Sequence, residues 1–348
     1  MKEIAFSPQL FYGQSGIEHL NDWMNREMPD SKRFVLVDDN TQLHCLPLVA
    51  DALGDCTVLQ MPAGESSKNF DTALRLIEEL GQSGADRDAV LMGLGGGVVS
   101  DMAGFVASIY KRGIGLVLLP TSLLCMTDAA HGGKTGVNLH MAKNVMGTFY
   151  PAQAICTSFR FLNSLPEEEY LSGMAEVLKH GMIASEQLLE LARKHWYRPA
   201  EWLSHSIAVK AEIVRQDPLE KGLRQILNFG HTAGHALEAA VHDEGSTISH
   251  GRAVAAGMCA ALRLSERKTS LNSDFSNYWI DELRGTFSLE GLKKRPFRSL
   301  RPWLKFDKKS RGGVLQFVLL SAPGQAVYEQ AVEQDELEWA WKSVFSCD

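Results

Sequence analysis

The sequence of 348 residues lacks any C-x-x-C pair, so its six scattered cysteines indicate neither a zinc ribbon nor a redox dithiol. It also lacks a long apolar run, because the most hydrophobic segment, residues 113–126, contains Pro120 and falls short of the ~20 residues that a membrane span needs. No apolar stretch of signal-peptide type follows Met1. Positive charge is not in excess either: 35 Lys and Arg against 42 Asp and Glu leave a net charge of −7, which disfavours nucleic acid and anionic membrane as partners. We therefore expect a soluble, cytoplasmic protein with reduced thiols.

The composition, with 45% hydrophobic and 22% charged residues, is that of a globular protein, and the length suggests about two domains. In the first half, short apolar runs alternate with helical patterns, which predicts βαβ units and a mainly parallel sheet. These runs are residues 34–37, 56–59, 89–92 and 116–119. After Pro166, helical periodicity dominates over residues 171–183, 187–195, 202–215 and 250–265, and residues 314–320 are a candidate hairpin strand. The sequence thus predicts an α/β domain over residues 1–165 and a mostly α-helical domain over residues 166–348, with a cleft between them as a usual ligand site.

A glycine-rich segment, Gly95–Asp101, follows a predicted strand and opens a predicted helix. Glycines there let backbone amides approach a pyrophosphate at the positive end of the helix. Val98 stands where the standard dinucleotide fingerprint has its last glycine, so a tight strand-to-helix turn is the structural alternative.

Three other polar segments are candidates for binding a nucleotide or another anion. The pair Asp38-Asp39 ends a predicted strand, where an acidic residue can accept ribose hydroxyls. Glu65 and Lys68 lie in a Gly/Ser loop, and the segment Asp128–Thr135 contains two glycines before a Lys and a Thr, without the spacing of a P-loop. The structural alternative is a solvated turn for Asp38-Asp39, a helix cap or surface pair for Glu65 and Lys68, and an ordinary turn for Asp128–Thr135.

Four metal-capable residues of the second half give a stronger signal. His231 and His235 are four residues apart on a predicted helix and project from one face, His250 opens another helix, and Glu176 lies on a third. Two or three histidines with a carboxylate suit a divalent metal that keeps an open position. Taken singly, each of these residues is better explained as a core or capping group.

Basic residues accompany them. Lys179 follows Glu176 by one turn, Lys210 lies on a later helical pattern, and Arg224 and Asn228 are predicted at i and i+4 on one helix face. Arg recognises carboxylate or phosphate with two parallel donors, so the group points to a small anionic substrate. An exposed helix face would show the same spacing.

The ordered set of motifs resembles the sugar phosphate cyclases, and among them the 3-dehydroquinate synthases, from about Gly95 to Phe317. The matching segments are Gly95–Val99 with Asp101, Arg112-Gly113, Pro120-Thr121, Asp128 with Gly132–Gly136, Lys143-Asn144, Met174–Lys179, Lys210-Ala211, Leu227–His235, His250-Gly251 and Asp307–Lys309. The resemblance implies a Rossmann-like, parallel-sheet NAD-binding domain followed by a mostly α-helical domain that holds zinc or cobalt. It also implies a carbon–oxygen lyase of the shikimate pathway, which leads to chorismate and the aromatic amino acids.

The resemblance assigns three sets of residues by their places in these motifs. The metal ligands are Glu176, His231 and His250, whereas His235 belongs beside the substrate. Substrate binding and proton transfer fall to Asp128, Lys134, Asn144, Lys179, Lys210, Arg224, Asn228, His235 and Lys308. NAD binding falls to Asp39, Glu65, Lys68, Gly96, Gly97, Val98, Asp101, Thr121, Ser122, Lys143 and Ser164, with Arg112 beside Lys143 in the phosphate and cofactor shell.

The substrate that the resemblance implies is 3-deoxy-D-arabino-heptulosonate 7-phosphate, which becomes 3-dehydroquinate and phosphate. NAD transiently oxidises a ring hydroxyl, phosphate is eliminated, the hydride returns, and an intramolecular aldol step closes the carbocycle; the metal stabilises the developing enolate. We also expect a homodimer. His131, Pro218 and Arg252 depart from the family pattern, but they replace no metal ligand or anion-binding residue.

Three other functions stay open at this point. Another cyclase, making 2-epi-5-epi-valiolone, 2-deoxy-scyllo-inosose or aminodehydroquinate, would take a different sugar phosphate, and a neutral sugar offers no carboxylate to Lys210, Arg224 and Asn228. A metal-dependent polyol dehydrogenase would release NADH and would not need so many basic residues. A catalytically silent NAD-binding protein is disfavoured because the metal and basic sets are complete.

Overall fold

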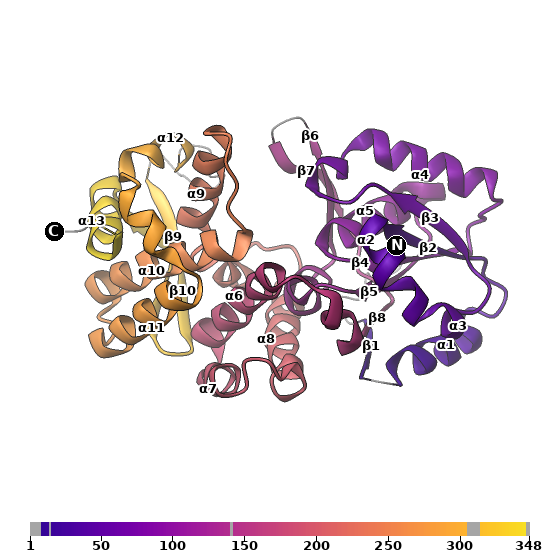
Figure 1. Cartoon of the computed structure of the whole chain (residues 1–348), viewed down its shortest axis with the longest axis horizontal. Helices are drawn as coiled ribbons and strands as arrows, with labels where there is room; N and C mark the ends of the chain where they lie inside the picture. The colour runs from indigo at the N-terminus through magenta and orange to yellow at the C-terminus, as the bar shows by residue number, and fades with distance from the viewer. Residues whose placement is uncertain (1–7, 14, 140–141, 305–313, 346–348) are drawn as a thin grey trace. The chain divides into compact units, whose positions relative to one another are not determined.

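The computed structural model describes residues 8–13, 15–139, 142–304 and 314–345, and the chain forms two compact units. Unit 1 consists of Met1–Pro166 and Lys210–Pro218, and unit 2 of Glu167–Val209 and Leu219–Asp348. The chain therefore passes from one unit to the other three times, and Figure 1 traces its course from indigo at the N-terminus to yellow at the C-terminus.

Unit 1 is built on a six-stranded sheet in which all neighbouring strands are parallel. In the order across the sheet, the strands are β1 (Gln9–Tyr12), β8 (Ala154–Thr157), β5 (Gly115–Pro120), β4 (Val90–Gly95), β2 (Arg33–Asp38) and β3 (Thr57–Met61). Its helices are α1 (Gly16–Glu27), α2 (Asp39–His44), α3 (Ala50–Leu53), α4 (Phe70–Gln82) and α5 (Gly97–Ile109). The four apolar runs of the sequence are thus confirmed as strands of one parallel sheet.

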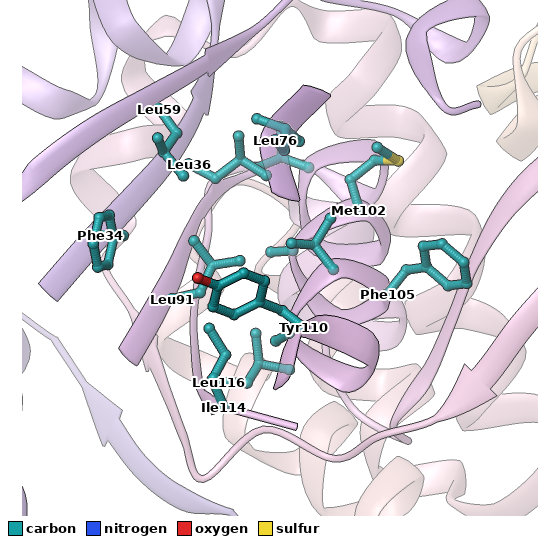
Figure 2. Close-up of a cluster of buried hydrophobic side chains, with 14 of the residues drawn as sticks. Phe34, Leu36, Leu59, Leu76, Leu91, Met102, Phe105, Tyr110, Ile114 and Leu116 are labelled. Atoms are coloured by element: carbon teal, nitrogen blue, oxygen red, sulfur yellow. The ribbon is translucent and has the colours of Figure 1, made fainter. Parts of the chain in front are cut away.

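The central strands are apolar on both faces because helices cover both. In β2, Phe34 and Leu36 join the cluster that also contains Met102 and Phe105 of α5, whereas the alternate residues Val35 and Val37 are buried outside that cluster. Figure 2 shows this cluster, in which Leu36 of β2, Leu91 of β4 and Leu116 of β5 lie on the same side of the sheet as Met102 and Phe105 of α5.

The strand order reverses between β2 and β4, since β3 lies on one side of β2 and β4, β5 and β8 follow on the other. In open α/β sheets, ligands bind outside the carboxyl ends of the strands at such a switch point. An antiparallel hairpin, β6 (Lys134–Leu139) and β7 (Ala142–Phe149), lies outside this sheet and packs along α5.

Unit 2 is mostly helical, as predicted. It contains α6 (Glu167–Ala184), α7 (Glu186–Lys194), α9 (His231–Asp243), α10 (His250–Thr269), α11 (Ser273–Thr286), α12 (Arg301–Leu304) and α13 (Gln334–Phe345). The candidate hairpin strand is confirmed as β9 (Leu315–Ala322), which pairs with β10 (Gln325–Val332). Helix α8 (Leu203–Gln216) begins in unit 2 and ends in unit 1. None of the helices in the described ranges combines the length and the apolar character that crossing a membrane requires.

Candidate functional site

Three helices of unit 2 bring one carboxylate and two imidazoles together. Glu176 lies in the middle of α6 and is 1% exposed, whereas His231 and His250 are the first residues of α9 and α10. Oε1 of Glu176 is 3.6 Å from Nε2 of His231 and 3.6 Å from Nε2 of His250. These separations are too long for hydrogen bonds.

The three atoms have the spacing of ligands around one small cation. Metal–ligand bonds of about 2.0–2.2 Å in tetrahedral geometry place neighbouring ligand atoms about 3.4 Å apart. One carboxylate and two imidazoles form a donor set known from catalytic zinc sites, which keep a further position open for water or substrate. The donor set and its spacing therefore fit a divalent metal.

Both histidines are oriented by their other ring nitrogen. Nδ1 of His231 is 3.2 Å from the carbonyl oxygen of Phe229, and Nδ1 of His250 is 3.2 Å from Oε2 of Glu238. Each acceptor favours a proton on Nδ1, so a metal ion would bind at Nε2, the ring nitrogen that faces Glu176. Glu238 lies on α9 and was missed in the sequence, where nothing marks it as a neighbour of His250.

The surroundings of the two imidazoles differ in charge. Burial holds the pKa of His231 well below its usual range, and the neighbouring Lys179 ammonium acts in the same direction. Burial also lowers the pKa of His250, but the contacts with Glu176 and Glu238 outweigh it and raise that pKa to about 10. The carboxylates of Glu176 and Glu238 thus favour positive charge beside His250, where a metal cation would bind.

Close backbone contacts bring α9 and α10 together. At Gly257 of α10, a Cβ atom would collide with the carbonyl oxygen of Gly230, the residue before His231. Gly230 itself has φ +80, a left-handed conformation that glycine adopts without strain. Glycine at these positions therefore allows α9 and α10 to approach closely enough for their first residues to share one site.

Further polar groups lie beside the three ligands. Lys179 contacts Oε2 of Glu176 and is 1% exposed, so its charge is paired with that carboxylate. His235 is exposed, and its ring centre is 5.2 Å from that of His231 and 6.1 Å from that of His250. The structure therefore brings all the metal-capable residues of the sequence analysis into one cluster.

The predicted shared helix face of Arg224 and Asn228 is wrong. Both lie in a six-residue 3₁₀ helix, Leu223–Asn228, in which residues four apart point about 120° away from each other. Gly222 precedes this turn and the left-handed Gly230 follows it closely, so the helical segment is short. Arg224 is buried and Asn228 is half-buried, with its Nδ2 donating to Oε1 of Glu220 at 2.8 Å.

In unit 1, the glycine-rich segment lies at the switch point of the sheet. Gly95 ends β4, Gly96 is the N-cap of α5 and Gly97 is its first residue, as the sequence predicts. At the end of the neighbouring β2, the Asp38 carboxylate caps α2 by accepting from the Thr41 amide at 2.8 Å. Asp39 is exposed and accepts from Gln60 at 2.7 Å and from the Ala63 amide at 3.1 Å.

Lys68 is buried and contacts two other predicted site residues. Nζ of Lys68 donates to Oδ2 of Asp101 and to Oδ1 of Asn144, both at 2.5 Å, and Lys68 is 4% exposed. Burial raises the pKa of the Asp101 carboxyl, and the Lys68 ammonium opposes that shift. This part of unit 1 therefore joins residues that the sequence analysis assigned to cofactor and to substrate.

The other assigned residues lie in several local structures. Lys210 is the first residue of the second segment of unit 1, Lys210–Pro218. Its Nζ donates to Oδ1 of Asp128 at 2.6 Å. Thr121 and Ser122 follow β5 and are buried, and Lys134 starts β6 and is exposed. Val98 is half-buried in the first turn of α5, Ser164 ends a 3₁₀ helix, Arg112 is exposed with φ +72, and Lys143 lies on β7. Lys308 lies outside the described residues.

The three departures from the family pattern all lie among the described residues. His131 is buried, with Nε2 3.0 Å from the carbonyl oxygen of Met126. Arg252 donates to the carbonyl oxygens of Phe287 and Ser288, so it connects α10 to the segment after α11. Pro218 is half-buried at the end of the segment that returns to unit 1.

Comparison with known proteins covers most of the chain. The family described as 3-dehydroquinate synthase N-terminal matches residues 58–172, and 3-dehydroquinate synthase C-terminal matches residues 173–310. The 3-dehydroquinate synthase of Parabacteroides distasonis is 36% identical, with 88% of this chain and 89% of that protein covered. That of Symbiobacterium thermophilum is 37% identical, with 96% and 97% covered.

Solved structures agree with the fold. A 2-epi-5-epi-valiolone synthase from Streptomyces hygroscopicus, with NAD⁺ and Zn²⁺ bound, is 25% identical with a TM-score of 0.85, covering 99% of this chain and 98% of that one. A 2-deoxy-scyllo-inosose synthase complexed with carbaglucose-6-phosphate, NAD⁺ and Co²⁺ has a TM-score of 0.81 at 23% identity, covering 99% of both chains. At that identity, the second likeness concerns the fold alone.

Proposed function

The chain belongs to the 3-dehydroquinate synthase family, and on that basis we propose that it converts 3-deoxy-D-arabino-heptulosonate 7-phosphate to 3-dehydroquinate and phosphate. The observation that carries the proposal is the convergence of Glu176, His231 and His250, whose ligand atoms have the spacing of a catalytic metal site. Because the family match extends across both units, the proposal concerns the whole reaction rather than one binding step.

The proposed cofactor is NAD, held by the residues around the switch point of unit 1. Gly96 and Gly97 at the start of α5 would offer backbone amides to a pyrophosphate, and Asp39, the first residue of α2, is proposed to accept ribose hydroxyls. The remaining proposed contacts are Glu65, Lys68, Val98, Asp101, Thr121, Ser122, Lys143 and Ser164. When bound, NAD supplies reversible hydride transfer.

The proposed metal ligands are Glu176, His231 and His250, and the bound ion supplies Lewis-acid polarisation of substrate oxygens. Lys179 shares the Glu176 carboxylate and can present its ammonium group to an anionic substrate. Exposed His235, next to both histidine ligands, is proposed to hold or accept a proton beside the substrate. We propose zinc or cobalt as the metal.

The substrate carries a phosphate and a carboxylate, so it requires cations. Lys179, Lys210 and Arg224 are each less than a tenth exposed, and Lys179 and Lys210 already contact the carboxylates of Glu176 and Asp128. We propose that Lys210, Arg224 and Asn228 recognise the carboxylate end, and that Arg112, Lys143 and Asn144 lie toward the phosphate. Asp128, which accepts from Lys210, would orient that ammonium group. Lys134 and Lys308 are proposed as further substrate contacts.

Product identification tests the proposal most directly. Purified protein is incubated with NAD, a divalent metal and either the acidic heptulosonate phosphate, sedoheptulose 7-phosphate or glucose 6-phosphate. We expect 3-dehydroquinate and phosphate from the first substrate and little product from the others. Faster cyclisation of sedoheptulose 7-phosphate would instead assign the chain to another cyclase reaction.

A further inference from the structure

We propose that Asn138 is a positioning residue that couples the binding of NAD to the binding of substrate; this inference rests on the proposed function and deepens it. Asn138 lies on β6 and belongs to none of the cofactor, substrate or metal sets assigned above. Its contacts join the loop that carries Glu65 and Lys68 to the β7 residue Asn144.

Asn138 is connected to the loop through both its backbone and its side chain. The backbone nitrogen of Asn138 donates to the carbonyl oxygen of Lys68 at 2.8 Å, and Asn138 forms an isolated parallel β-bridge with Asn69. Its Nδ2 donates to Oε1 of Glu65 at 2.8 Å. Two of the residues proposed to bind NAD are therefore positioned by one asparagine.

The side-chain oxygen of Asn138 is directed to Asn144. Oδ1 of Asn138 accepts from the backbone nitrogen of Asn144 at 2.9 Å, and Asn144 has φ +54. Asparagine tolerates this left-handed conformation better than most residues, and the hydrogen bond holds it there. Nζ of Lys68 donates to Oδ1 of Asn144, which closes a ring of three residues.

This ring gives a physical route for coupling. A dinucleotide that orders Glu65 and Lys68 also fixes Asn138, and Asn138 then fixes the backbone from which Asn144 reaches the substrate. Coupling between two ligands is reciprocal, and it typically changes each affinity by about 5- to 150-fold. We therefore expect substrate to bind more tightly when the cofactor site is filled.

Calorimetry can measure this coupling without turnover, because NADH cannot oxidise the substrate. The dissociation constant of 3-deoxy-D-arabino-heptulosonate 7-phosphate is measured with and without NADH for wild type, Asn138→Ala, Asn138→Asp and Asn25→Ala. We expect a ratio of at least about fivefold in wild type and a ratio near one in Asn138→Ala. Asn25 on α1 is the control, because its exposed side chain accepts one hydrogen bond, from Arg33 of β2, and its replacement should leave the ratio unchanged.

Asn138→Asp separates the two halves of the contact. Aspartate still accepts from the Asn144 amide, but it places a second carboxylate against Glu65. We expect the dissociation constant of NADH to rise about tenfold, while substrate binding without NADH stays close to that of wild type. This variant also decides the matter if Asn138→Ala does not fold.

The inference would be overturned if Asn138→Ala kept the wild-type ratio of dissociation constants. It would also be overturned if Asn138→Asp weakened the binding of NADH and of substrate equally. Wild-type protein that binds both ligands independently would overturn it as well. A wild-type protein that forms no 3-dehydroquinate would overturn the proposed function itself, so the two failures are distinguishable.

Discussion

The backbone of Gly251 lies against that of Ser172, one turn before Glu176 on α6. A Cβ atom at position 251 would collide with the Cα of Ser172 and lie 3.1 Å from both its nitrogen and its oxygen. Because Gly251 directly follows His250, this contact sets the distance between a proposed metal ligand and the carboxylate it faces.

Gly251→Ala should therefore push α10 away from α6. Overpacking of this kind lowers the free energy of unfolding by about 1–3 kcal/mol, and we expect zinc affinity to fall at least about tenfold. Thermal unfolding and zinc titration against a coloured chelator measure the two effects. Gly285→Ala on α11 is the matched control, because its Cβ would meet no atom within 4 Å. Unchanged zinc affinity in Gly251→Ala would contradict the role of this contact.

Glu238→Ala should weaken metal binding without removing a ligand. The carboxylate faces Nδ1 of His250, and loss of such a supporting group typically costs about 10- to 100-fold in metal affinity. Glu238→Gln keeps an acceptor oxygen and should lose less. Zinc competition and the visible spectrum of the cobalt form report the change, with exposed Glu282→Ala as control. Zinc binding as tight as wild type in Glu238→Ala would show that His250 is oriented by other groups.

Metal removal should abolish turnover, because Glu176, His231 and His250 offer their ligand atoms to one ion. We expect dialysis against a chelator to eliminate product formation, and added zinc or cobalt to restore it. Product analysis together with elemental analysis of the same sample checks this. Full activity in demonstrably metal-free protein would refute the proposed metal centre.

NAD should be required but not consumed. The proposed substrate and its two products differ by no net oxidation, since 3-dehydroquinate plus phosphoric acid has the composition of the substrate. We expect product to accumulate with no matching rise in the absorbance of the reduced nicotinamide. A steady rise in proportion to product would identify a dehydrogenase instead.

Arg224→Ala should impair the acidic substrate more than a neutral sugar phosphate. A hydrogen bond to a charged group contributes about 1.5–3 kcal/mol, so kcat/KM for the acidic heptulosonate should fall at least about tenfold. NAD binding should change little, which a separate titration checks. Arg215→Ala is the control because that side chain is exposed and pairs with Glu212. Equal losses on acidic and neutral substrates would argue against carboxylate recognition by Arg224.

The regular elements could be predicted because their patterns are local. The alternation of Phe34–Val37 with helical segments indicated a parallel sheet, and the start of α10 at His250 follows from its apolar periodicity. The position of Gly95 to Asp101 between a strand and a helix is predictable for the same reason. The metal-capable cluster was also anticipated, although spacing alone pairs His231 with His235 as readily as with His250.

The supporting residues could not be predicted, because their contacts join distant parts of the chain. Asn138 contacts a loop about 70 positions earlier, and Glu238 meets His250 across two helices. The short 3₁₀ helix around Arg224 was missed because its residues also fit an α-helical face. The expected homodimer, the cytoplasmic location and the boundary at residues 165–166 stay predictions.

Because the chain passes three times between its units, the places where the polypeptide can be split are limited. Residues 210–218 lie more than forty positions beyond Pro166, yet they belong to unit 1 and include Lys210, the partner of Asp128. No single break of the polypeptide therefore yields two fragments that each carry one whole unit. A split version of this protein would therefore have to exchange a segment between its halves.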